Sequence, residues 1–405
     1  MLECERYIQP FMRAMLMIAQ KYYDVVYIIT NPITKGNSIE GEKIVHVENP
    51  NSVRRRSMLL SPLRLFSKDI LNHALIAIKT RRFNKEFFKS IKLYVCYGMA
   101  FYRTTLPIVN RHRNDCNIHI LACWFFVEAC VAGFFKKKYN KIKTFSLAHS
   151  FEIDPLKNNF VDLSFNQWKH QYLDGIYFIS SKMLGIYNQA TNGIYQKVYG
   201  SKMYVSYLGC IKKFPELNPY MKFNKIRIVS CSYVRVEKRL DLILEVMSLW
   251  SLCPIEWVHI GNGPMFEQMV QRSKQIMAKN PQVVIDFRGY KSNEDVQLFY
   301  TKEQVDCFIN LSVSEGVPVA IMEAIAYGIP VIATNVGGVS EIVQEQYGIL
   351  LSAEDDAVTI KARLEAFIST YKEDAIQMRV HANKFWQEKF NAEKNYNTFF
   401  ETLRE

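Results

Sequence analysis

The sequence predicts an α/β protein built from two doubly wound domains, each with a parallel sheet. Its 405 residues, 49% of them hydrophobic, exceed the length of one typical domain and can fill two cores. From residue 226 onward, short β-branched runs alternate with longer helical patterns, as in a parallel sheet that helices cover on both faces. The first half shows the same alternation less regularly.

The first half opens with a helical pattern over residues 4–22. We expect strands at residues 24–30, 93–97, 144–148 and 175–180. Because a helical pattern comes first, we expect the first strand of this domain to be missing. The domain boundary is expected within residues 208–224, where Gly209, Pro215 and Pro219 interrupt the patterns. These observations predict a first domain at residues 1–212.

The second half predicts a more regular sheet. Strands are expected at residues 226–230, 255–260, 283–287, 305–311 and 330–333. In such sheets ligands bind at the carboxyl ends of the strands, so the loops that follow them are the place for a site. The tail at residues 372–405 has a helical pattern rich in aromatic residues and needs a partner to pack on. We therefore expect a second domain at residues 213–385 and a helix at residues 386–405 that returns to the first domain.

The positive charge of the chain is concentrated in its first half. Residues 1–210 contain 29 Lys and Arg against 14 Asp and Glu, whereas the remainder contains 22 against 25. Between residues 54 and 103 the basic residues alternate with Leu, Phe and Ile; they include Arg54, Arg55, Arg56, Arg64, Lys68, Arg81, Arg82, Lys85, Lys89 and Lys92. This pattern fits either contact with anionic lipid head groups or a solvated helix face. No nucleic-acid-binding module accompanies the charge, so nucleic acid is not the expected partner.

Three further features concern location. The nine cysteines are scattered without a CxxC pair, which indicates neither a disulfide framework nor a zinc cluster and favours a reducing cytoplasm. The first residues, MLECERYIQP, lack the basic and apolar regions of a signal peptide. The apolar run at residues 118–135 is interrupted by His119 and Glu128, so we expect a buried amphipathic helix there rather than a membrane span.

The segment at residues 308–343 has the strongest chemical signal. An apolar run ends at Leu311, a polar loop follows, Pro318 suits a first helical turn and Gly328 suits a helix end. A helix that begins just after a parallel strand offers free backbone N–H groups and a positive dipole end to a phosphate. Glu315 and Glu323 flank this position, and each carboxylate can accept hydrogen bonds from two hydroxyl groups. This outline fits a nucleoside diphosphate sugar.

Glu315, Glu323 and the residues between them resemble the E-x7-E signature of retaining family 4 glycosyltransferases, which have the GT-B fold of two Rossmann-like domains. Several further segments resemble family motifs in the same order. They are FSLAHSFEID at residues 145–154, VSCSYVRVEKRLDLI at residues 229–243, WVHIGNGPMFEQM at residues 257–269 and FRGYKSNEDV at residues 287–296. The resemblance covers residues 145–343 in detail. Within the family, the chain resembles bacterial surface-polysaccharide glycosyltransferases.

The resemblance implies transfer of a hexose, with retention, from a UDP- or GDP-sugar to a hydroxyl of a cell-surface glycan or lipid-linked acceptor. It implies no metal ion and no cofactor beyond this donor substrate, and a cytoplasmic protein at the inner face of the cell membrane. The implied catalytic residues are Glu315 for the sugar hydroxyls, Lys238 for the donor phosphate and His149 for the sugar. The implied donor-binding residues are Glu323, which would hold the ribose, and Gly316, Val317, Pro318, Val319, Arg235, Arg239, Gly261 and Tyr290.

Two departures from the family pattern leave alternatives open. Tyr233 stands where the family often has an arginine, and Arg235 or Arg239 is the expected substitute. The missing first strand and its Gly-rich loop suggest either a start that lies upstream, a truncated protein or a fold with altered activity. A nucleotide-sugar epimerase of the same fold and a catalytically impaired nucleotide- or glycan-binding subunit are therefore kept as alternatives. Gly337 and Gly338 are expected to form a turn rather than to bind ligand.

Overall fold

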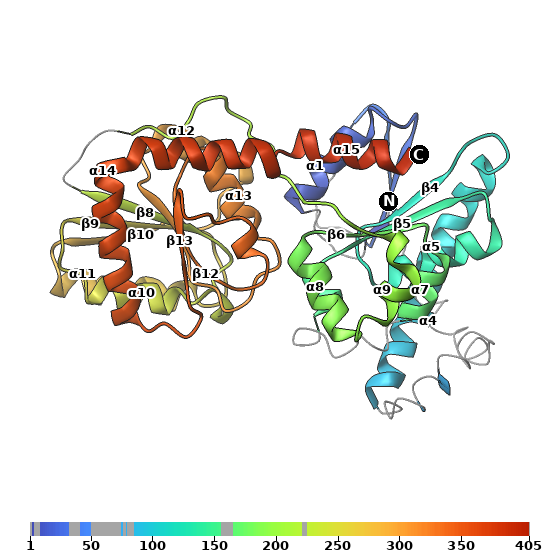
Figure 1. Ribbon diagram of the computed structural model, residues 1–405, viewed down its shortest axis with the longest axis horizontal. Coiled ribbons are helices and arrows are strands. Elements are labelled where there is room, and N and C mark those ends of the chain that lie inside the picture. Colours follow the sequence, from blue (N-terminus) through green and yellow to red (C-terminus); the bar gives the residue numbers. More distant parts are fainter. Residues whose placement is uncertain are drawn as a thin grey trace. The chain divides into compact units, whose positions relative to one another are not determined.

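The computed structural model describes residues 2–3, 9–31, 41–49, 74–75, 78, 85–154, 165–220 and 225–404, and it divides into two compact units (Figure 1). Unit 1 consists of Met1–Tyr207 together with Asn397–Glu405. Unit 2 is the continuous segment Leu208–Tyr396. The chain therefore passes from one unit to the other between Tyr207 and Leu208 and again between Tyr396 and Asn397.

Unit 1 contains a seven-stranded sheet with the order β3-β2-β1-β4-β5-β6-β7, in which the neighbouring strands pair in parallel. Its strands are β1 (Leu2–Glu3), β2 (Val26–Thr30), β3 (Ile44–Glu48), β4 (His119–Ala122), β5 (Lys143–Ala148), β6 (Gly175–Phe178) and β7 (Met203–Val205). The predicted strands at residues 24–30, 144–148 and 175–180 correspond to β2, β5 and β6.

Two predictions about unit 1 are wrong. The first strand is present: Leu2 pairs with Ile29 and Ala122, so β1 lies between β2 and β4 in the centre of the sheet. A strand of two residues is too short to produce a hydrophobic pattern, so no local signal reveals it. The predicted strand at residues 93–97 is part of helix α4 (Lys85–His112), because a short apolar, aromatic run fits a buried helix as well as a strand.

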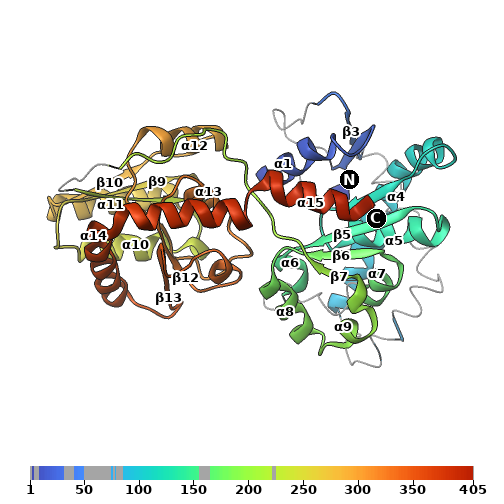
Figure 2. The ribbon, with the colours of Figure 1, turned by 45° about the horizontal axis from the view of Figure 1, so that its top comes forward.

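The helices of unit 1 pack around this sheet. They are α1 (Pro10–Ala19), α4, α5 (Val127–Lys138), α6 (Ser150–Ile153), α7 (Asn166–Tyr172), α8 (Ser181–Ala190), α9 (Ile194–Tyr199) and the short η2 (Gly200–Lys202). Helices α5 and α7 lie side by side (Figure 2). The apolar run at residues 118–135 was predicted to form one buried helix. This prediction is wrong in part, because the run forms strand β4 and most of the buried helix α5.

The C-terminal part of helix α15 (Ala392–Arg404) completes unit 1 beside α1, as both views show (Figures 1 and 2). The hydroxyl of Tyr22, just after α1, donates to Asn397 Oδ1 at 2.9 Å. The ring of Phe399 meets the ring of Tyr177 edge-on with 4.9 Å between centroids. Phe399 and Phe400, the aromatic residues of this helix that belong to unit 1, are therefore buried there.

Unit 2 contains a six-stranded parallel sheet with the order β10-β9-β8-β11-β12-β13. Its strands are β8 (Ile226–Cys231), β9 (Ile255–Ile260), β10 (Val283–Phe287), β11 (Cys307–Asn310), β12 (Val331–Thr334) and β13 (Gly348–Leu351). The five strands predicted in this half coincide with β8 to β12 within two residues at each end. Continuous apolar, β-branched runs are typical of parallel strands that are buried on both faces, so they are easy to recognise.

The helices of unit 2 follow the strands. They are η3 (Val236–Lys238), α10 (Leu240–Ser248), α11 (Phe266–Lys279), α12 (Asn293–Lys302), α13 (Val319–Ala326), η4 (Val339–Glu341) and α14 (Ala357–Lys389). Helices α10 and α11 lie on one side of the sheet and α12 and α13 on the other (Figure 1). The strand order therefore reverses between β8 and β11, which is the point where doubly wound sheets bind their ligands.

The structure bears on two further predictions, the one about a membrane span and the one about a basic surface, only for the residues that it describes. Within the residues described, no helix is both long and apolar enough to cross a bilayer. Of the basic residues predicted to form a charged surface, Lys85 and Lys89 are exposed on α4. The side chains of the others, from Arg54 to Arg82 and Lys92, lie outside the described residues.

Candidate functional site

Two loops of unit 2 meet at the point where the strand order reverses. The loop after β8 carries Lys238, and the loop after β11 carries Glu315. The Lys238 Nζ atom lies 2.7 Å from Glu315 Oε1, and Asn310 Nδ2 donates to the same oxygen at 3.2 Å. The N–H of Val313 also donates to the carbonyl of Glu237 at 3.0 Å, so the two loops are joined through their backbones as well. The structure thus brings two of the predicted catalytic residues together as a partly buried ion pair.

Helix α13 begins directly after this pair. Pro318 is the residue that precedes the first helical turn, and its side chain does not cap the helix start. The first N–H groups of a helix have no partner within the helix, so those of Val319 and Ala320 can face an anion, whereas the N–H of Ile321 already donates to the carbonyl of Pro318 at 3.1 Å. The predicted donor-binding segment Gly316, Val317, Pro318 and Val319 therefore forms a helix start at the ligand-binding edge of the sheet.

A glycine on the next loop fixes the position of Glu315. Gly337 has a φ of +55°, and a Cβ atom there would lie 2.0 Å from the carbonyl oxygen of Glu315. The N–H of Gly338 donates to the carbonyl of Gly316 at 2.6 Å. These two glycines form a tight turn, as predicted, and the turn supports the backbone of the loop that carries Glu315.

Glu323 lies on α13 in a different electrostatic environment. Its side chain is buried, and its Oε1 atom accepts a hydrogen bond from Asn293 Nδ2 at 2.5 Å. Burial raises the pKa of Glu323 to about 7, and the hydrogen bond from Asn293 opposes this rise. One glutamate of the predicted pair is thus held by an ammonium group, and the other by a neutral amide in apolar surroundings. Two carboxyl groups with such different partners are suited to different roles.

The loops after β9 and β10 also reach this edge of the sheet. Gly261 has a φ of +145°, and a Cβ atom there would lie 1.9 Å from the carbonyl oxygen of Ser232. The N–H of Gly261 donates to the carbonyl of Gly289 at 2.8 Å. Gly261 therefore allows the loops after β8, β9 and β10 to pack backbone against backbone. Tyr290, next to Gly289, is 72% exposed.

The two predicted arginine substitutes differ in their contacts. The guanidinium of Arg235 lies 5.1 Å from the ring centre of Tyr233, and both side chains are exposed. Arg239 has a φ of +49°, and its Nη1 atom donates to the carbonyl of Ala353 at 2.7 Å. Arg239 thus ties the start of α10 to the loop after β13, whereas Arg235 presents its charge at the surface.

His149, the third predicted catalytic residue, belongs to unit 1 and follows strand β5. Its Nε2 atom lies 3.0 Å from the carbonyl oxygen of Cys123, and its ring lies 4.4 Å from the ring of Trp124. Burial lowers the pKa of His149 to about 4, so the ring is neutral near pH 7. Because a carbonyl can only accept, Nε2 must carry the ring's single proton. The imidazole therefore acts as a neutral polar group with a fixed tautomer.

Sequence reasoning missed several residues that support these groups. Glu152 Oε2 accepts from the backbone N–H of His149 at 2.9 Å, and burial raises the pKa of Glu152 well above its ordinary value. Lys169, also fully buried, donates to the carbonyl of Phe125 at 2.8 Å and stabilises the loop after β4. The spacing of His149 and Glu152 matches a capping box and could have been noticed. The contacts of Asn293 and Asn310 depend on tertiary structure.

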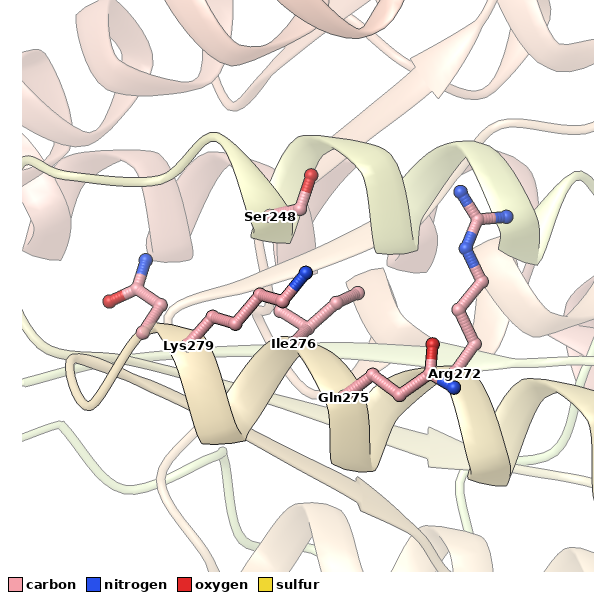
Figure 3. Close-up of a pocket in the computed structure, with 6 residues that line it drawn as sticks. Ser248, Arg272, Gln275, Ile276 and Lys279 are labelled. Carbon is pink, nitrogen blue, oxygen red and sulfur yellow. The ribbon is translucent and has the colours of Figure 1, made fainter.

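A cavity of about 300 Å³ lies elsewhere in unit 2, between α10 and α11 (Figure 3). Figure 3 shows Arg272, Gln275 and Lys279 projecting from α11 on the side that faces α10. None of the predicted site residues lines it, and Arg272 pairs with the exposed Glu245 at 3.2 Å. Within the described part of the chain, no group of three or more His, Cys, Asp or Glu residues is placed to hold a metal ion.

Comparisons with known proteins relate this chain to glycosyltransferases. Residues 218–384 match the family model described as glycosyl transferases group 1. Over 114 residues the chain is 32% identical to the putative colanic acid biosynthesis glycosyltransferase WcaL of Escherichia coli, which is 27% of each chain. Over 185 residues it is 24% identical to the amylovoran biosynthesis glycosyltransferase AmsK of Erwinia amylovora, which is 44% of each chain. The chain thus spans between about a quarter and a half of the length of these curated relatives.

Solved structures match the whole chain at low sequence identity. Anabaena Alr3699/HepE in complex with UDP superimposes with a TM-score of 0.68 and 15% identity, covering 100% of this chain and 99% of that one. The lipopolysaccharide outer core galactosyltransferase WaaB superimposes with a TM-score of 0.64 and 13% identity, covering 98% and 97%. With two parallel-sheet units, the fold is therefore GT-B.

Proposed function

We propose that this chain, which carries a glycosyl transferases group 1 domain at residues 218–384, transfers a hexosyl group from a UDP- or GDP-sugar to a hydroxyl group, with retention of configuration. The observation that carries the proposal is the convergence of Lys238, Glu315 and the start of α13 at the point where the strand order reverses. An ammonium group and free backbone N–H groups at one place suit a diphosphate.

The reaction breaks the bond between the anomeric carbon and the diphosphate oxygen, and forms a bond from that carbon to the acceptor oxygen. Negative charge grows on the leaving diphosphate, and Lys238 and the backbone N–H groups of Gly316, Val317 and Val319 stabilise it. The acceptor's proton passes to the departing diphosphate, so no protein nucleophile and no metal ion are required. Glu315 holds hydroxyl groups of the sugar, and Glu323 holds the hydroxyl groups of the ribose.

His149 contributes its neutral ring as a contact for the sugar, with its Nε2 proton already donated to the carbonyl of Cys123. The position of His149 depends on the loop after β5, because the carboxylate of Glu152 accepts a hydrogen bond from the backbone N–H of His149. Tyr290 is exposed on the loop after β10, where it is free to contact the nucleotide base. Arg235 supplies a surface charge for the phosphates, whereas Arg239 is occupied by the carbonyl of Ala353.

The acceptor in this proposal is a growing surface polysaccharide or its lipid-linked precursor. The names of the matching relatives support this choice, since they refer to the biosynthesis of colanic acid and of amylovoran. Lipid-linked acceptors fit the basic first half of the chain, in which Lys85 and Lys89 are exposed and Lys136–Lys138 end helix α5. We place the protein in the cytoplasm, with contact to the inner face of the cell membrane.

The test is release of nucleotide from a panel of UDP- and GDP-sugars, with calorimetric binding of UDP and GDP alongside. The wild type and Glu323→Ala are compared with Glu345→Ala, which removes an exposed glutamate of the same unit. Release by the wild type and by Glu345→Ala, but not by Glu323→Ala, supports the proposal and identifies the donor. Binding without release from any sugar would favour a catalytically impaired subunit, and no binding of either nucleotide would refute the donor site.

A further inference from the structure

A chain of hydrogen bonds in unit 2 connects Glu323 to the backbone of residues 213–214. Asn293 Nδ2 donates to Glu323 Oε1 at 2.5 Å, and Gln297 Nε2 donates to Asn293 Oδ1 at 2.9 Å. Gln297 Oε1 in turn accepts from the N–H of Lys213 at 2.9 Å and from the hydroxyl of Tyr327 at 2.8 Å. Gln297 and Tyr327 are buried, so these groups have no access to water in place of their partners.

The donor and the acceptor of every hydrogen bond in this series follow from one group, the backbone N–H of Lys213. A backbone N–H can only donate, so the atom of the Gln297 amide that faces Lys213 must be the oxygen. The other end of that amide is then the NH2 group, which obliges Asn293 to turn its oxygen toward Gln297. The NH2 group of Asn293 must therefore face Glu323. The usual ambiguity in the orientation of amide side chains is removed at both positions by the backbone of Lys213.

We propose that Asn293 and Gln297 are positioning residues for Glu323, and that they present a hydrogen-bond donor to its carboxylate so that it is held ready for the ribose hydroxyls of the donor nucleotide. The inference rests on the proposed function in one respect only, namely that Glu323 receives the ribose. The hydrogen-bond chain itself does not depend on the ligand. A donor stabilises the ionised form of a carboxyl group, and only the ionised form can accept from two hydroxyl groups with both oxygens.

The groups around Glu323 leave Asn293 as the main stabilising partner of its charge. Among the described residues, the titratable side chains that interact electrostatically with Glu323 include Cys210, Cys231, Tyr300 and Tyr327. Burial raises the pKa of all four, to about 12 for Cys231 and Tyr327, so they stay neutral below pH 9. Lys238, which interacts with Cys231, is paired with Glu315. The titration of Glu323 between pH 5 and 9 therefore depends on its burial and on its hydrogen bond with Asn293.

The first experiment follows the titration of Glu323 in the full chain by 13C NMR of labelled glutamate carboxyl groups, with the signal assigned by Glu323→Gln. Loss of the donor in Asn293→Ala is expected to raise the pKa of Glu323 by about one unit above the wild-type value. Gln297→Met, which adds no charge and leaves Asn293 unrestrained, is expected to raise it by a smaller amount. Gln297→Glu is expected to raise it most, because Asn293 must then turn its oxygen to Glu323 and a second negative charge is added.

The control is Lys213→Ala, which removes an exposed side chain and its 2.7 Å ion pair with Glu294 but keeps the backbone N–H that sets the direction of the chain. It is expected to leave the titration unchanged. Thermal melting of each variant shows whether it is folded. If one variant at Asn293 or Gln297 does not fold, the variant at the other position still decides the test. An unchanged pKa of Glu323 in both Asn293→Ala and Gln297→Met would overturn the proposal.

The second measurement is the affinity for UDP and GDP as a function of pH. At pH 7 a rise of one unit lowers the ionised fraction of Glu323 from about one half to about one tenth, so affinity is expected to fall about fivefold in Asn293→Ala. The loss should vanish near pH 9, which a general structural defect would not produce. A shifted titration with unchanged nucleotide affinity would refute the role of Glu323 in ribose binding and leave the hydrogen-bond chain intact. No nucleotide binding by the wild type would refute the proposed function, and the titration would still decide the positioning role of Asn293.

Discussion

Lys238 and Glu315 lie on loops that follow neighbouring strands, and they form an ion pair with 2.7 Å between Nζ and Oε1. The pair is partly buried, and Asn310 adds a hydrogen bond to the same carboxylate oxygen. Removing either partner of a desolvated pair leaves the other without compensation, so the effect of a substitution here exceeds the small value of a surface ion pair. The two residues therefore have to be tested with both activity and stability as readouts.

The first prediction concerns Lys238. Lys238→Ala is expected to reduce release of nucleotide from the donor sugar by about 10²- to 10³-fold, because it removes a charge that stabilises the leaving diphosphate. The neighbouring Arg239 cannot take over this role, because its guanidinium is bound to the carbonyl of Ala353. Single-turnover kinetics with saturating donor measures the effect. Activity close to that of the wild type would remove Lys238 from the mechanism.

The second prediction concerns the opposite effects of the two glutamates on stability. The pKa of Glu323 is raised to about 7 in the folded chain from an ordinary value of 4.5, so the folded state holds a proton that the unfolded state has lost. The contribution of this proton to the free energy of unfolding is thus fully present below pH 4.5. It is lost as the pH rises through 7, which lowers the free energy of unfolding by about 3 kcal/mol. Glu323→Gln is expected to remove this loss and to be more stable than the wild type at pH 8.

Urea unfolding at pH 5 and pH 8 measures this difference, and Glu315→Gln is the matched comparison. It leaves Lys238 with a weaker partner and is expected to be less stable than the wild type at pH 8. Equal stability of the wild type and Glu323→Gln at pH 8 would show that the carboxyl group of Glu323 is not strained by burial.

The third prediction concerns Gly337. Gly337→Ala is expected to lower the free energy of unfolding by about 2 to 4 kcal/mol and to lose most activity, because the added Cβ atom meets the carbonyl oxygen of Glu315. Gly289→Ala is the control: its φ is +67°, but nothing lies within 4 Å of the added atom. It should cost only about 1 kcal/mol of left-handed backbone strain. Similar losses in both variants would mean that the contact with Glu315 has no importance.

The fourth prediction concerns which group makes the proposed activity rise with pH near 7, where Glu323 ionises. Since burial lowers the pKa of His149 to about 4, this ring does not titrate between pH 5.5 and 8. His149→Ala is expected to lower activity by about tenfold or more while keeping the rise of activity with pH near 7. Glu323→Gln should remove that rise. Steady-state rates from pH 5.5 to 8.5 separate the two residues, and loss of the rise in His149→Ala would assign it to the histidine instead.

The sequence predicted unit 2 better than unit 1 for physical reasons. Strands β8 to β12 are buried parallel strands, whose continuous β-branched runs differ from the surrounding helices. Strand β1 has two residues and receives its place from its neighbours β2 and β4, which no local pattern can reveal. Residues 93–97 have the composition of a strand but continue a long helix, α4.

The same distinction applies to the site. Glu315 and Glu323 could be proposed from the sequence because they flank a helix start that follows a predicted strand, whereas Lys238 could be named only through the family resemblance. Asn293 could not, because its partner Glu323 lies thirty residues away on another helix, and the polarity of its amide is set by Gln297 and the backbone of Lys213. Hydrogen bonds between side chains of different elements leave no periodic trace in a sequence.

The division of unit 1 between the two ends of the chain affects the order in which the protein can be made. Unit 2 is one continuous segment and has all its residues once Tyr396 has left the ribosome. Unit 1 starts to emerge before unit 2, yet the ring of Tyr177 meets Phe399 only after all of unit 2 has been synthesised. During translation, the N-terminal part of unit 1 therefore keeps an aromatic surface uncovered until residues 397–404 have been synthesised and can pack on it.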